Sequence, residues 1–391
     1  MMRRILLFTT HFYPGFRAGG ILKACVRLVN NISNDFIFTV ITSNTDLGSD
    51  DVYFEAVPNI NKFRRNVLVV YLDNSIRSIL GFLFSKKKKY DIIHVNSFFC
   101  FKFSLFPVLL WKIGFWPNTH LLLSVHGEFS PGALKIKNFK KSLFIKLVKC
   151  MRLYNAIYWH ATSELERDCI IDVFPNSAKR IIIAPYFINE DFDILFQKRN
   201  QREIDRNVGP LEIVFLSRLT VKKNLIFLLE ILHEIKSKVN LTIIGPIEDV
   251  KYWNKCETLI NSLPENVNST YKGEIEPINI TTEFSKYDLF VFPTLGENFG
   301  YVILESLVSG TSVLLSDTTP WIKCDKELAV EIIPLSNKNL WIEKIDGWSS
   351  KSQNDLKVCR EQTQIYLKKN YSMDSIFKKN KQMYLHLIQS V

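Results

Sequence analysis

Short apolar runs alternate with amphipathic stretches along the first half of the chain. The runs are unbroken stretches of Ile, Leu, Val and Phe, as expected for parallel strands that are covered on both sheet faces. They predict strands at Arg4–Thr10, Phe36–Thr42, Val67–Tyr71, Asp91–Val95, Leu121–Val125 and Ala156–Ala161. Helical periodicity lies between them, as in Ile21–Ile32 and Ala133–Met151. Strands that alternate with helices predict βαβ units in a parallel sheet.

A second alternating series follows a polar stretch, Gln197–Gly209, that lacks apolar periodicity and is predicted to be a linker. The series predicts strands at Glu212–Leu216, Leu241–Ile244, Asp288–Phe292 and Ser312–Leu315. A last helix is expected from Ser372 onward, with Ser372 as its N-cap. The pattern therefore predicts an α/β chain with two doubly wound, Rossmann-like domains, residues 1–196 and 210–371, and a ligand-binding cleft between them.

Composition agrees with a folded protein of two domains. The chain has 391 residues, of which 47% are hydrophobic and 23% are charged. Its seven cysteines are widely spaced and include no CxxC pair, so neither a disulfide framework nor a zinc site is expected. This cysteine usage predicts a reducing compartment. No apolar run approaches the roughly 20 residues needed to span a bilayer. The short apolar N-terminus is predicted to be a first strand, not a signal peptide.

The net charge of +11 is concentrated in the first half of the chain. Residues 1–200 hold 27 Lys and Arg against 15 Asp and Glu, a net of +12, so the remainder is nearly neutral. This asymmetry indicates an anionic partner for the first domain. Nucleic acid, an anionic membrane surface and a phosphorylated substrate would each satisfy it.

The strongest candidate site in the second domain follows the expected strand at Asp288–Phe292. Gly296 to Gly300 form a turn, and a helix is expected from Tyr301 onward. A helix N-terminus after a parallel strand offers free N–H groups to a phosphate. Glu297 in the turn and Glu305 in the helix can accept hydrogen bonds from sugar hydroxyls. The alternative is that Glu297 caps the helix and Glu305 is a solvated helix residue.

Two cations follow another predicted strand of the same domain. Arg218 and Lys223 come after the strand Glu212–Leu216, at the edge where open α/β sheets bind ligands. An arginine fork and a lysine point charge can together neutralise a diphosphate. The alternative, a solvated basic loop, explains the local sequence equally well.

The first domain offers two weaker candidates. Gly19 and Gly20 lie between the first strand and the first helix, where glycine lets the backbone approach a phosphate closely. This is not the GxGxxG of dinucleotide-binding proteins, and a lone GG is more often only a turn. His126 follows the strand Leu121–Val125 and precedes a glycine, but a lone histidine is more often structural.

Taken in order, these residues resemble the retaining glycosyltransferases of family 4, which have the GT-B fold. The resemblance covers nearly the whole chain, and the glutamates at 297 and 305 are its most specific element. The segments SVHGEFSPGALKIKNFKK (124–141), HATSELE (160–166) and SDTTPW (316–321) are similar to bacterial members that build surface polysaccharide. The resemblance implies that the helix at 372–391 packs back onto the first domain.

The resemblance also assigns roles to the second-domain residues. Arg218 and Lys223 would bind the donor diphosphate. Glu305 would hold the nucleotide ribose, and Glu297 the donor sugar. Contacts with sugar and phosphate would come from the backbone amides of Asn298, Phe299 and Gly300.

For the first domain, the resemblance places Gly19 and Gly20 along the diphosphate and the acceptor, and His126 near the anomeric carbon. The expected catalytic set is thus His126, Arg218, Lys223 and Glu297. Two departures from the commonest family pattern are expected to lie away from this set. Ser217 stands where glycine often precedes the arginine, and Pro185-Tyr186-Phe187 replaces a frequent Pro-Asn-Gly turn.

The activity implied is a retaining, metal-independent transfer without a cofactor. The donor would be a nucleotide-diphosphate sugar, with uridine preferred, and the acceptor a lipid-linked or oligosaccharide glycan of capsule, O-antigen or exopolysaccharide. A nucleotide-sugar 2-epimerase of GT-B fold and a non-catalytic nucleotide-sugar-binding protein are the alternatives. Nucleic-acid binding is not expected, because the basic half lacks a recognisable reader module.

The stretch Ala133–Met151 carries lysines beside apolar residues at helical spacing. Such a helix can lie on an anionic membrane surface, where a lipid-linked acceptor would be found. The alternative is a surface helix whose apolar face lies in the core. We therefore expect a cytoplasmic protein with peripheral attachment to the inner face of the plasma membrane. The tract Lys86–Lys89 is predicted to be a solvated loop that adds to the positive field.

Overall fold

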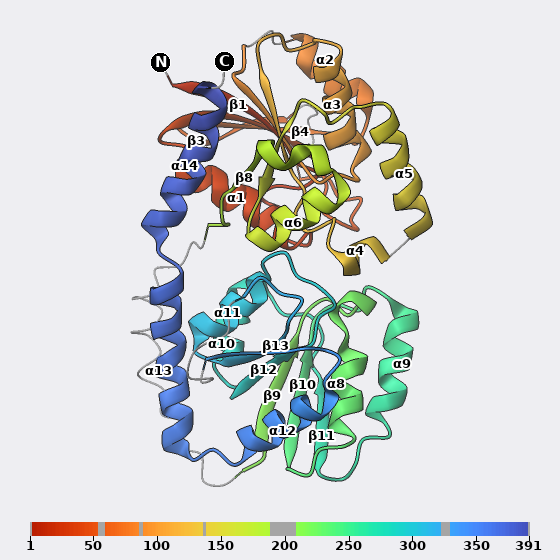
Figure 1. Cartoon of the computed structure of the whole chain (residues 1–391), viewed down its shortest axis with the longest axis vertical. Helices are drawn as coiled ribbons and strands as arrows, with labels where there is room; N and C mark the ends of the chain where they lie inside the picture. Colours follow the sequence, from red (N-terminus) through yellow and green to blue (C-terminus); the bar gives the residue numbers. More distant parts are fainter. Residues whose placement is uncertain are drawn as a thin grey trace. The chain divides into compact units, whose positions relative to one another are not determined.

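The computed structural model describes residues 2–53, 59–85, 89–135, 138–187, 209–321 and 329–389. The chain divides into two compact units, Met1–Asn189 with Met373–Val391, and Glu190–Ser372 (Figure 1). We call them unit 1 and unit 2. The predicted linker at 197–209 lies outside the described residues except for Gly209. Within the described ranges, no helix combines the length and apolar content required to cross a bilayer.

Unit 1 is built on an eight-stranded sheet with the order β3-β4-β2-β1-β5-β6-β7-β8. Every neighbouring pair is parallel except β3 and β4. Its strands are β1 (Arg3–Phe8), β2 (Phe36–Ser43), β3 (Asn59–Arg64), β4 (Val67–Leu72), β5 (Ile92–Asn96), β6 (His120–Ser124), β7 (Tyr158–Ala161) and β8 (Ile181–Ile183).

Helices flank this sheet and bury its apolar faces. They are α1 (Gly20–Ile32), α2 (Ile76–Ser85), the π-helix η1 (Phe101–Leu105), α3 (Phe106–Lys112), α4 (Pro131–Lys135), α5 (Asn138–Cys150), α6 (Glu164–Val173), the 3-10 helix η2 (Pro175–Arg180) and α14 (Met373–Gln389). The last of these comes from the far end of the chain. Its Tyr384 is fully buried, and the ring centroid lies 5.3 Å from that of Phe36 on β2.

Unit 2 has a six-stranded, fully parallel sheet with the order β11-β10-β9-β12-β13-β14. Its strands are β9 (Leu211–Leu216), β10 (Val239–Ile244), β11 (Val267–Tyr271), β12 (Leu289–Phe292), β13 (Ser312–Ser316) and β14 (Val330–Ile333). The flanking helices are the 3-10 turn η3 (Val221–Lys223), α8 (Leu225–Leu232), α9 (Val250–Ile260), the 3-10 turn η4 (Pro277–Asn279), α10 (Ile280–Phe284), α11 (Tyr301–Ser309), α12 (Lys338–Ser349) and α13 (Gln353–Asn370).

Ten of the fourteen described strands overlap the ten predicted from apolar runs. The four that were not predicted are β3, β8, β11 and β14, which are the edge strands of the two sheets. Where one helix was expected at 133–151, the structure describes two, α4 and α5, and residues 136 and 137 between them lie outside the described ranges.

Each sheet has a position where the strand order reverses. In unit 2 it lies between β9 and β12, and in unit 1 between β1 and β5. Loops that leave the carboxyl ends of two such strands diverge to opposite faces of the sheet, which opens a crevice suited to ligands. The predicted site residues of unit 2 belong to these two loops, except Glu305, which lies in the helix α11 that follows one of them. In unit 1 the glycine pair follows β1, and His126 follows β6, the strand next to β5.

Candidate active site

Two loops of unit 2 are tied together at the strand-order reversal. The Leu295 amide and the Thr294 hydroxyl both donate to the backbone oxygen of Lys222, at 2.8 and 3.1 Å. Asn224 has a left-handed backbone with φ 61°, and its side-chain amide donates to the Pro293 oxygen at 2.9 Å. The loop after β9 is thereby fixed against the loop after β12 by one backbone amide and two side-chain donors, all of which bond to backbone oxygens.

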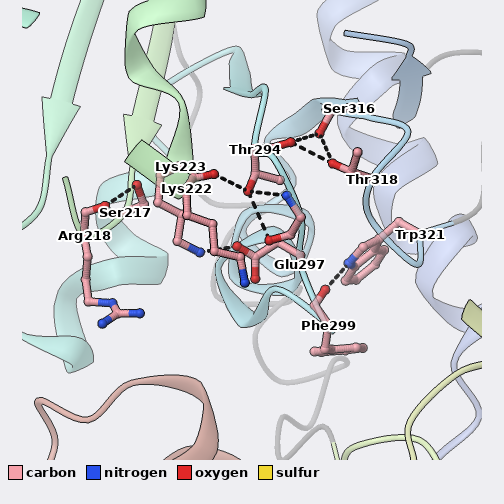
Figure 2. Close-up of polar contacts among 11 residues, drawn as sticks. Ser217, Arg218, Lys222, Lys223, Thr294, Glu297, Phe299, Ser316, Thr318 and Trp321 are labelled. Atoms are coloured by element: carbon pink, nitrogen blue, oxygen red, sulfur yellow. Dashed lines mark hydrogen bonds and ion pairs between the residues drawn. The ribbon is translucent and has the colours of Figure 1, made fainter. Parts of the chain in front are cut away.

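Lys223 and Glu297 form an ion pair across these two loops (Figure 2). The side chains are only 13% and 11% exposed, and the Lys223 ammonium also lies 5.3 Å from the ring centroid of Phe292. A pair this enclosed is weakly screened by water, so its electrostatic coupling is stronger than that of a surface pair. The structure therefore brings together a predicted diphosphate ligand and a predicted sugar ligand.

Arg218 does not join this pair. Its guanidinium pairs with Glu248 at 2.8 Å, and both side chains are more than two-fifths exposed. In Figure 2 the Arg218 side chain extends away from Glu297. The alternative of a solvated basic loop therefore describes Arg218 in this structure but not Lys223. For Arg218 to bind the same anion as Lys223, its side chain must leave Glu248.

The loop that carries Glu297 is anchored from β13 and the segment that follows it. The backbone oxygen of Thr294 accepts from the hydroxyls of Ser316 and Thr318 at 2.6 and 2.7 Å. The Glu297 amide donates to the Thr318 oxygen at 3.2 Å. Further along, the Trp321 indole donates to the Phe299 oxygen at 2.5 Å (Figure 2). These contacts hold the 296–300 turn from the side opposite Lys222.

Helix α11 begins directly after this turn, with Gly300 as its N-cap. Gly300 has φ 78°, which favours glycine, and a Cβ at this position would lie 2.7 Å from Ile303 Cδ1, so that side chain would have to shift. The N-cap position is held by Gly300, which has no side chain to cap the helix, and the first turn of α11 holds no acidic residue. The alternative reading of Glu297 as the cap of this helix is therefore wrong. The positive end of the α11 dipole lies at this turn.

Glu305 lies in the second turn of α11 and is 6% exposed. The alternative of a solvated helix residue is therefore wrong for this side chain as well. A carboxylate is seldom buried without partners, so its placement indicates a specific role.

In unit 1, Gly19 is the N-cap of α1 and has φ 69°. A Cβ there would meet no atom within 4 Å, so the backbone conformation, and not crowding, favours glycine. Gly20 is the first residue of α1, which has no capping side chain and no acidic residue in its first turn. The loop before it is held by Asp46, whose carboxylate accepts from the amides of Phe16 and Arg17 at 2.9 and 3.1 Å.

His126 has a defined tautomer. Its Nε2 lies 2.8 Å from Oδ1 of Asn96, whose own amide donates to the Phe8 oxygen. Because Oδ1 can only accept, Nε2 carries the proton and Nδ1 accepts from the hydroxyl of Tyr186. Burial, with a smaller contribution from His160, lowers the pKa of His126 to about 3. The ring is therefore neutral at physiological pH and already bonded at both nitrogens.

The contact between Tyr186 and His126 corrects one prediction. The segment Pro185-Tyr186-Phe187 was expected to lie away from the catalytic set, but Tyr186 bonds to one of its members and stacks on it with centroids 5.8 Å apart. Tyr186 is sixty residues from His126 in the sequence, so the sequence alone gives no sign of this contact. The contact is visible only in the structure, where Tyr186 follows the edge strand β8. Asn96 was also missed, although its position at the end of β5 is a usable signal.

Behind His126 lies a one-directional chain of buried hydrogen bonds. His160 Nε2 lies 2.8 Å from the Ala184 oxygen, so it must donate, and its Nδ1 accepts from Ser124. Ser124 in turn accepts from His94 Nε2, and His94 Nδ1 accepts from Tyr384 of α14. Burial lowers the pKa of His160 to about 4 and that of His94 well below its usual range. All three histidines are therefore neutral Nε2–H tautomers.

Metal ligands were not expected from the sequence. Among the residues that the structure describes, no group of three or more His, Cys, Asp or Glu side chains is placed to hold an ion. Metal independence stays a prediction.

Comparison with known proteins gives one family match. Residues 196–353 match the family model described as "Glycosyl transferases group 1". The chain is 23% identical over 290 residues to the "Uncharacterized 41.2 kDa protein in cps region" of Klebsiella pneumoniae, covering 71% of this chain and 74% of the relative. It is 24% identical over 333 residues to the alpha-monoglucosyldiacylglycerol synthase of Streptococcus pneumoniae, covering 80% and 70%.

Solved structures match over the whole chain. Sucrose-phosphate synthase from Thermosynechococcus elongatus has a TM-score of 0.76 at 16% identity, with both chains fully covered. The Anabaena protein HepE in complex with UDP and glucose has a TM-score of 0.66 at 15% identity, also with both chains fully covered. These likenesses confirm the predicted fold class, GT-B with two Rossmann-like domains.

Proposed function

We propose that this chain, a glycosyltransferase with a group 1 domain at residues 196–353, is a retaining enzyme that transfers a sugar from a UDP-sugar. The acceptor would be a lipid-linked or oligosaccharide glycan in surface-polysaccharide biosynthesis. The observation that carries the proposal is the enclosed pair of Lys223 and Glu297, with Glu297 in the turn that leads into the N-terminus of α11. The pair supplies a cation for a diphosphate and a carboxylate for sugar hydroxyls within one crevice.

The charge of the leaving group fits this site. As the glycosidic bond breaks, negative charge grows on the diphosphate and positive charge on the sugar. Lys223, the amides at 298–300 and the α11 dipole provide fixed positive charge without an added metal. Loss of one such preorganised interaction costs about 2.7–4 kcal/mol of transition-state stabilisation in enzymes that use similar devices.

The donor would exchange the partners of the ion pair. In this structure the Glu297 carboxylate satisfies Lys223. A bound diphosphate would take over Lys223 and release Glu297 to accept hydrogen bonds from the sugar. Arg218 would add its charge only after leaving Glu248. Glu305, buried in α11, would hold the ribose.

His126 fits a contact role better than an acid–base role. Its low pKa keeps the ring neutral, and Asn96 and Tyr186 fix its orientation. We infer that it positions the donor sugar near the anomeric carbon, with Gly19 and Gly20 beside the diphosphate and acceptor. The acceptor hydroxyl would attack the anomeric carbon on the same face from which the leaving group departs. The leaving phosphate would take the proton of that hydroxyl. No cofactor is required by this scheme.

The relatives support the substrate classes. HepE has been seen with UDP and glucose, which favours a uridine donor. The Klebsiella relative belongs to a cps region, which supports a role in capsule-type polysaccharide. The Streptococcus relative is named as a synthase of a glycosylated diacylglycerol, which supports a lipid-linked acceptor.

A lipid-linked acceptor would require attachment to a membrane surface, and α5 is suited to it. Phe139, Leu143 and Leu147 are each more than half exposed and recur every four residues, so they share one helix face. Phe144 on another face packs against the core. The stretch from 129 to 163 contains seven Lys and Arg and no Asp or Glu. We therefore propose peripheral binding to the anionic cytoplasmic face of the plasma membrane.

Thermal unfolding with UDP, GDP and ADP, each with and without EDTA, tests the donor site. A ligand at about 100 times its dissociation constant adds roughly 2.7 kcal/mol to the folded state. We expect UDP to raise the unfolding temperature whether or not EDTA is present. Stabilisation that EDTA abolishes would contradict metal independence, and the absence of any nucleotide effect would contradict the donor site.

Turnover is tested by hydrolysis of a UDP-sugar and by the anomeric configuration of the product. We expect Glu297→Ala to lower the rate by about 10²–10³-fold. Glu257→Ala is the matched control, because that glutamate lies on α9 and is exposed. Inversion of the anomeric centre in the product would overturn the retaining assignment while leaving the transferase intact.

A further inference from the structure

A cavity in unit 1 includes none of the residues assigned above to the donor or acceptor. Its volume is about 250 Å³. Its walls come from the last turn of α5, the segment that leads into β7, and η2. Nothing in the proposed transfer reaction uses it.

The cavity has an aromatic floor. The rings of Tyr154, Trp159 and Phe174 are packed together, with centroids 5.0 to 5.9 Å apart. Tyr154 is 4% exposed, and its hydroxyl has no hydrogen-bond partner among the described residues. A buried hydroxyl without a partner carries an energetic cost, so this wall of the cavity is not optimised for stability alone.

Three cations stand around this floor: Lys149, Arg152 and Arg180. The Lys149 ammonium lies 5.4 Å from the ring centroid of Phe174, and the Arg180 guanidinium donates to the Asn155 backbone oxygen. The remaining lining residues include no carboxylate. Three positive charges at one cavity without a counter-charge predict an anionic ligand, and two arginines favour phosphate oxygens in particular.

Arg152 occupies a position that usually favours glycine. It follows the C-terminus of α5 with φ 49°, and the Leu153 amide bonds back to the Val148 oxygen at 3.1 Å, as in a Schellman motif. A left-handed backbone is strained for an arginine and relaxed for a glycine. The sequence thus keeps a cation at the cavity where glycine would make a more stable helix end.

The cavity lies at the C-terminal end of α5, close in sequence to two of the exposed apolar side chains. Lys149 and Arg152 follow Leu147 by two and five residues, so exposed apolar side chains and the cationic rim belong to the same end of α5. Exposed apolar side chains near a basic pocket match the chemistry of an anionic bilayer, in which acyl chains lie below headgroup phosphates.

We propose that this cavity binds the phosphate of an anionic lipid headgroup while the exposed face of α5 contacts the bilayer. The inference rests on the proposed peripheral membrane association and adds a binding site for one kind of lipid headgroup. Lys149, Arg152 and Arg180 hold the phosphate oxygens, and the aromatic floor receives the glycerol carbons. Binding thereby depends on the chemistry of the headgroup and not only on the negative charge of the surface.

Cosedimentation with vesicles tests the proposal on the full chain. One set of vesicles is phosphatidylcholine alone, and the other contains a minor fraction of phosphatidylglycerol. The variants are Arg152→Gly and Arg180→Ala, with Lys179→Ala as the matched control. Lys179 is exposed and adjacent to Arg180 in η2 but does not line the cavity. Arg152→Gly relieves a left-handed arginine, so it removes the charge without a loss of folding.

We expect Arg152→Gly and Arg180→Ala each to weaken partition onto the phosphatidylglycerol vesicles by about tenfold, and Lys179→Ala to weaken it far less. Soluble glycerol phosphate should compete with the vesicles for the wild type. Equal losses in Arg180→Ala and Lys179→Ala would show general electrostatic attraction and overturn the pocket. If glycerol phosphate binds at the pocket while partition is the same in both variants, the ligand is a soluble phosphate and the lipid proposal is wrong.

The peripheral membrane association and the headgroup pocket can be tested separately. A Leu143→Ser, Leu147→Ser double variant removes the apolar face but leaves the pocket intact. If the wild type binds neither set of vesicles, the peripheral association and the pocket proposal both fall. If the double variant loses binding while the arginine variants bind like the wild type, the association stands and the pocket proposal alone is contradicted.

Discussion

The Lys223 ammonium and the Glu297 carboxylate hold each other in a position almost closed to water. Removal of one partner leaves the other charged and enclosed, so Glu297→Gln and Lys223→Met should each unfold at a lower temperature than the wild type. UDP should affect the variants in opposite ways. It should stabilise Glu297→Gln more than the wild type, because the diphosphate supplies the missing negative charge, and it should stabilise Lys223→Met less.

Thermal unfolding at matched UDP concentrations measures this difference. Lys251→Met, on the exposed surface of α9, serves as the control for loss of one positive charge. Equal UDP-dependent shifts in all four proteins would place the diphosphate away from Lys223.

The buried histidines make stability depend on pH. Burial lowers the pKa of His160 to about 4, whereas an unfolded histidine titrates near 6.5. Between these values the unfolded chain binds more protons than the folded one, so acid favours unfolding. We expect the free energy of unfolding of unit 1 to fall as the pH drops from about 6.5 to 4, by roughly 3 kcal/mol for His160 alone.

Urea denaturation at a series of pH values checks this loss. The His160→Gln variant should start less stable and show a smaller pH dependence over the same interval. A pH profile identical to that of the wild type would mean that His160 does not carry the effect.

Two buried tyrosines of unit 1 should respond oppositely to loss of the hydroxyl. The Tyr154 hydroxyl has no partner among the described residues, whereas that of Tyr384 donates to His94 at 2.7 Å. Tyr154→Phe should therefore leave the free energy of unfolding unchanged or raise it. Tyr384→Phe should lower it by about 1–3 kcal/mol, because His94 loses its donor inside the core. Chemical denaturation of both variants measures this contrast, and destabilisation by Tyr154→Phe would reveal a partner for that hydroxyl.

Candidate site residues could be predicted from the sequence where they directly follow a predicted strand. His126, Lys223 and Glu297 were all identified from the apolar run that precedes each of them. Their partners were not, because the sequence separation of 74 residues between Lys223 and Glu297 carries no information on contact. The pair became visible only once β9 and β12 were seen to be neighbours in the sheet.

At the scale of elements, the start of α11 depends on Gly300. An alanine there would have to adopt φ 78° and would approach Ile303 Cδ1 to 2.7 Å. We expect Gly300→Ala to lower both the unfolding temperature and UDP binding, since the amides at 298–300 would shift. The matched control is Gly347→Ala in α12, where a Cβ meets no atom within 4 Å. Alanine inside a helix should raise the free energy of unfolding by about 0.5–1 kcal/mol relative to glycine. Thermal unfolding and UDP titration of both variants test this, and normal UDP affinity in Gly300→Ala would remove these amides from the donor site.

Apolar runs predicted the interior strands and failed for all four edge strands, for a physical reason. An interior strand is covered by helices on both faces and by strands on both sides, so its sequence is continuously apolar, as in β12 (LFVF). An edge strand lacks one neighbour and tolerates polar residues, as in β11 (VNSTY) and β3 (NINKFR). β8 has only three residues, too short for any pattern to stand out.

At the scale of the whole molecule, α14 joins residues separated by nearly the full chain. Met383 is fully buried on α14 and belongs to unit 1, although α13 before it belongs to unit 2. Met383→Ala should therefore destabilise unit 1 by about 2–5 kcal/mol. Ile365→Ala, at an exposed position of α13, is the control.

Hydrogen exchange resolves which part of the molecule responds. Amides of β1 and β5 should exchange faster in Met383→Ala, while those of β9 and β12 should keep their wild-type rates. Faster exchange confined to α14 itself would show that this helix is not part of the cooperative unit.

Because α14 follows unit 2 in the chain, unit 1 stays incomplete until all of unit 2 has been synthesised. Residues 1–189 emerge first, and the helix that supplies Tyr384 to His94 follows only after all of unit 2. At about 5–20 residues per second, translation of the intervening chain takes on the order of 10 to 40 s. During that interval the surface that α14 will cover is open to solvent, and it is accessible to chaperones that bind nascent chains. Unit 2 can therefore finish folding before the half of the protein that precedes it.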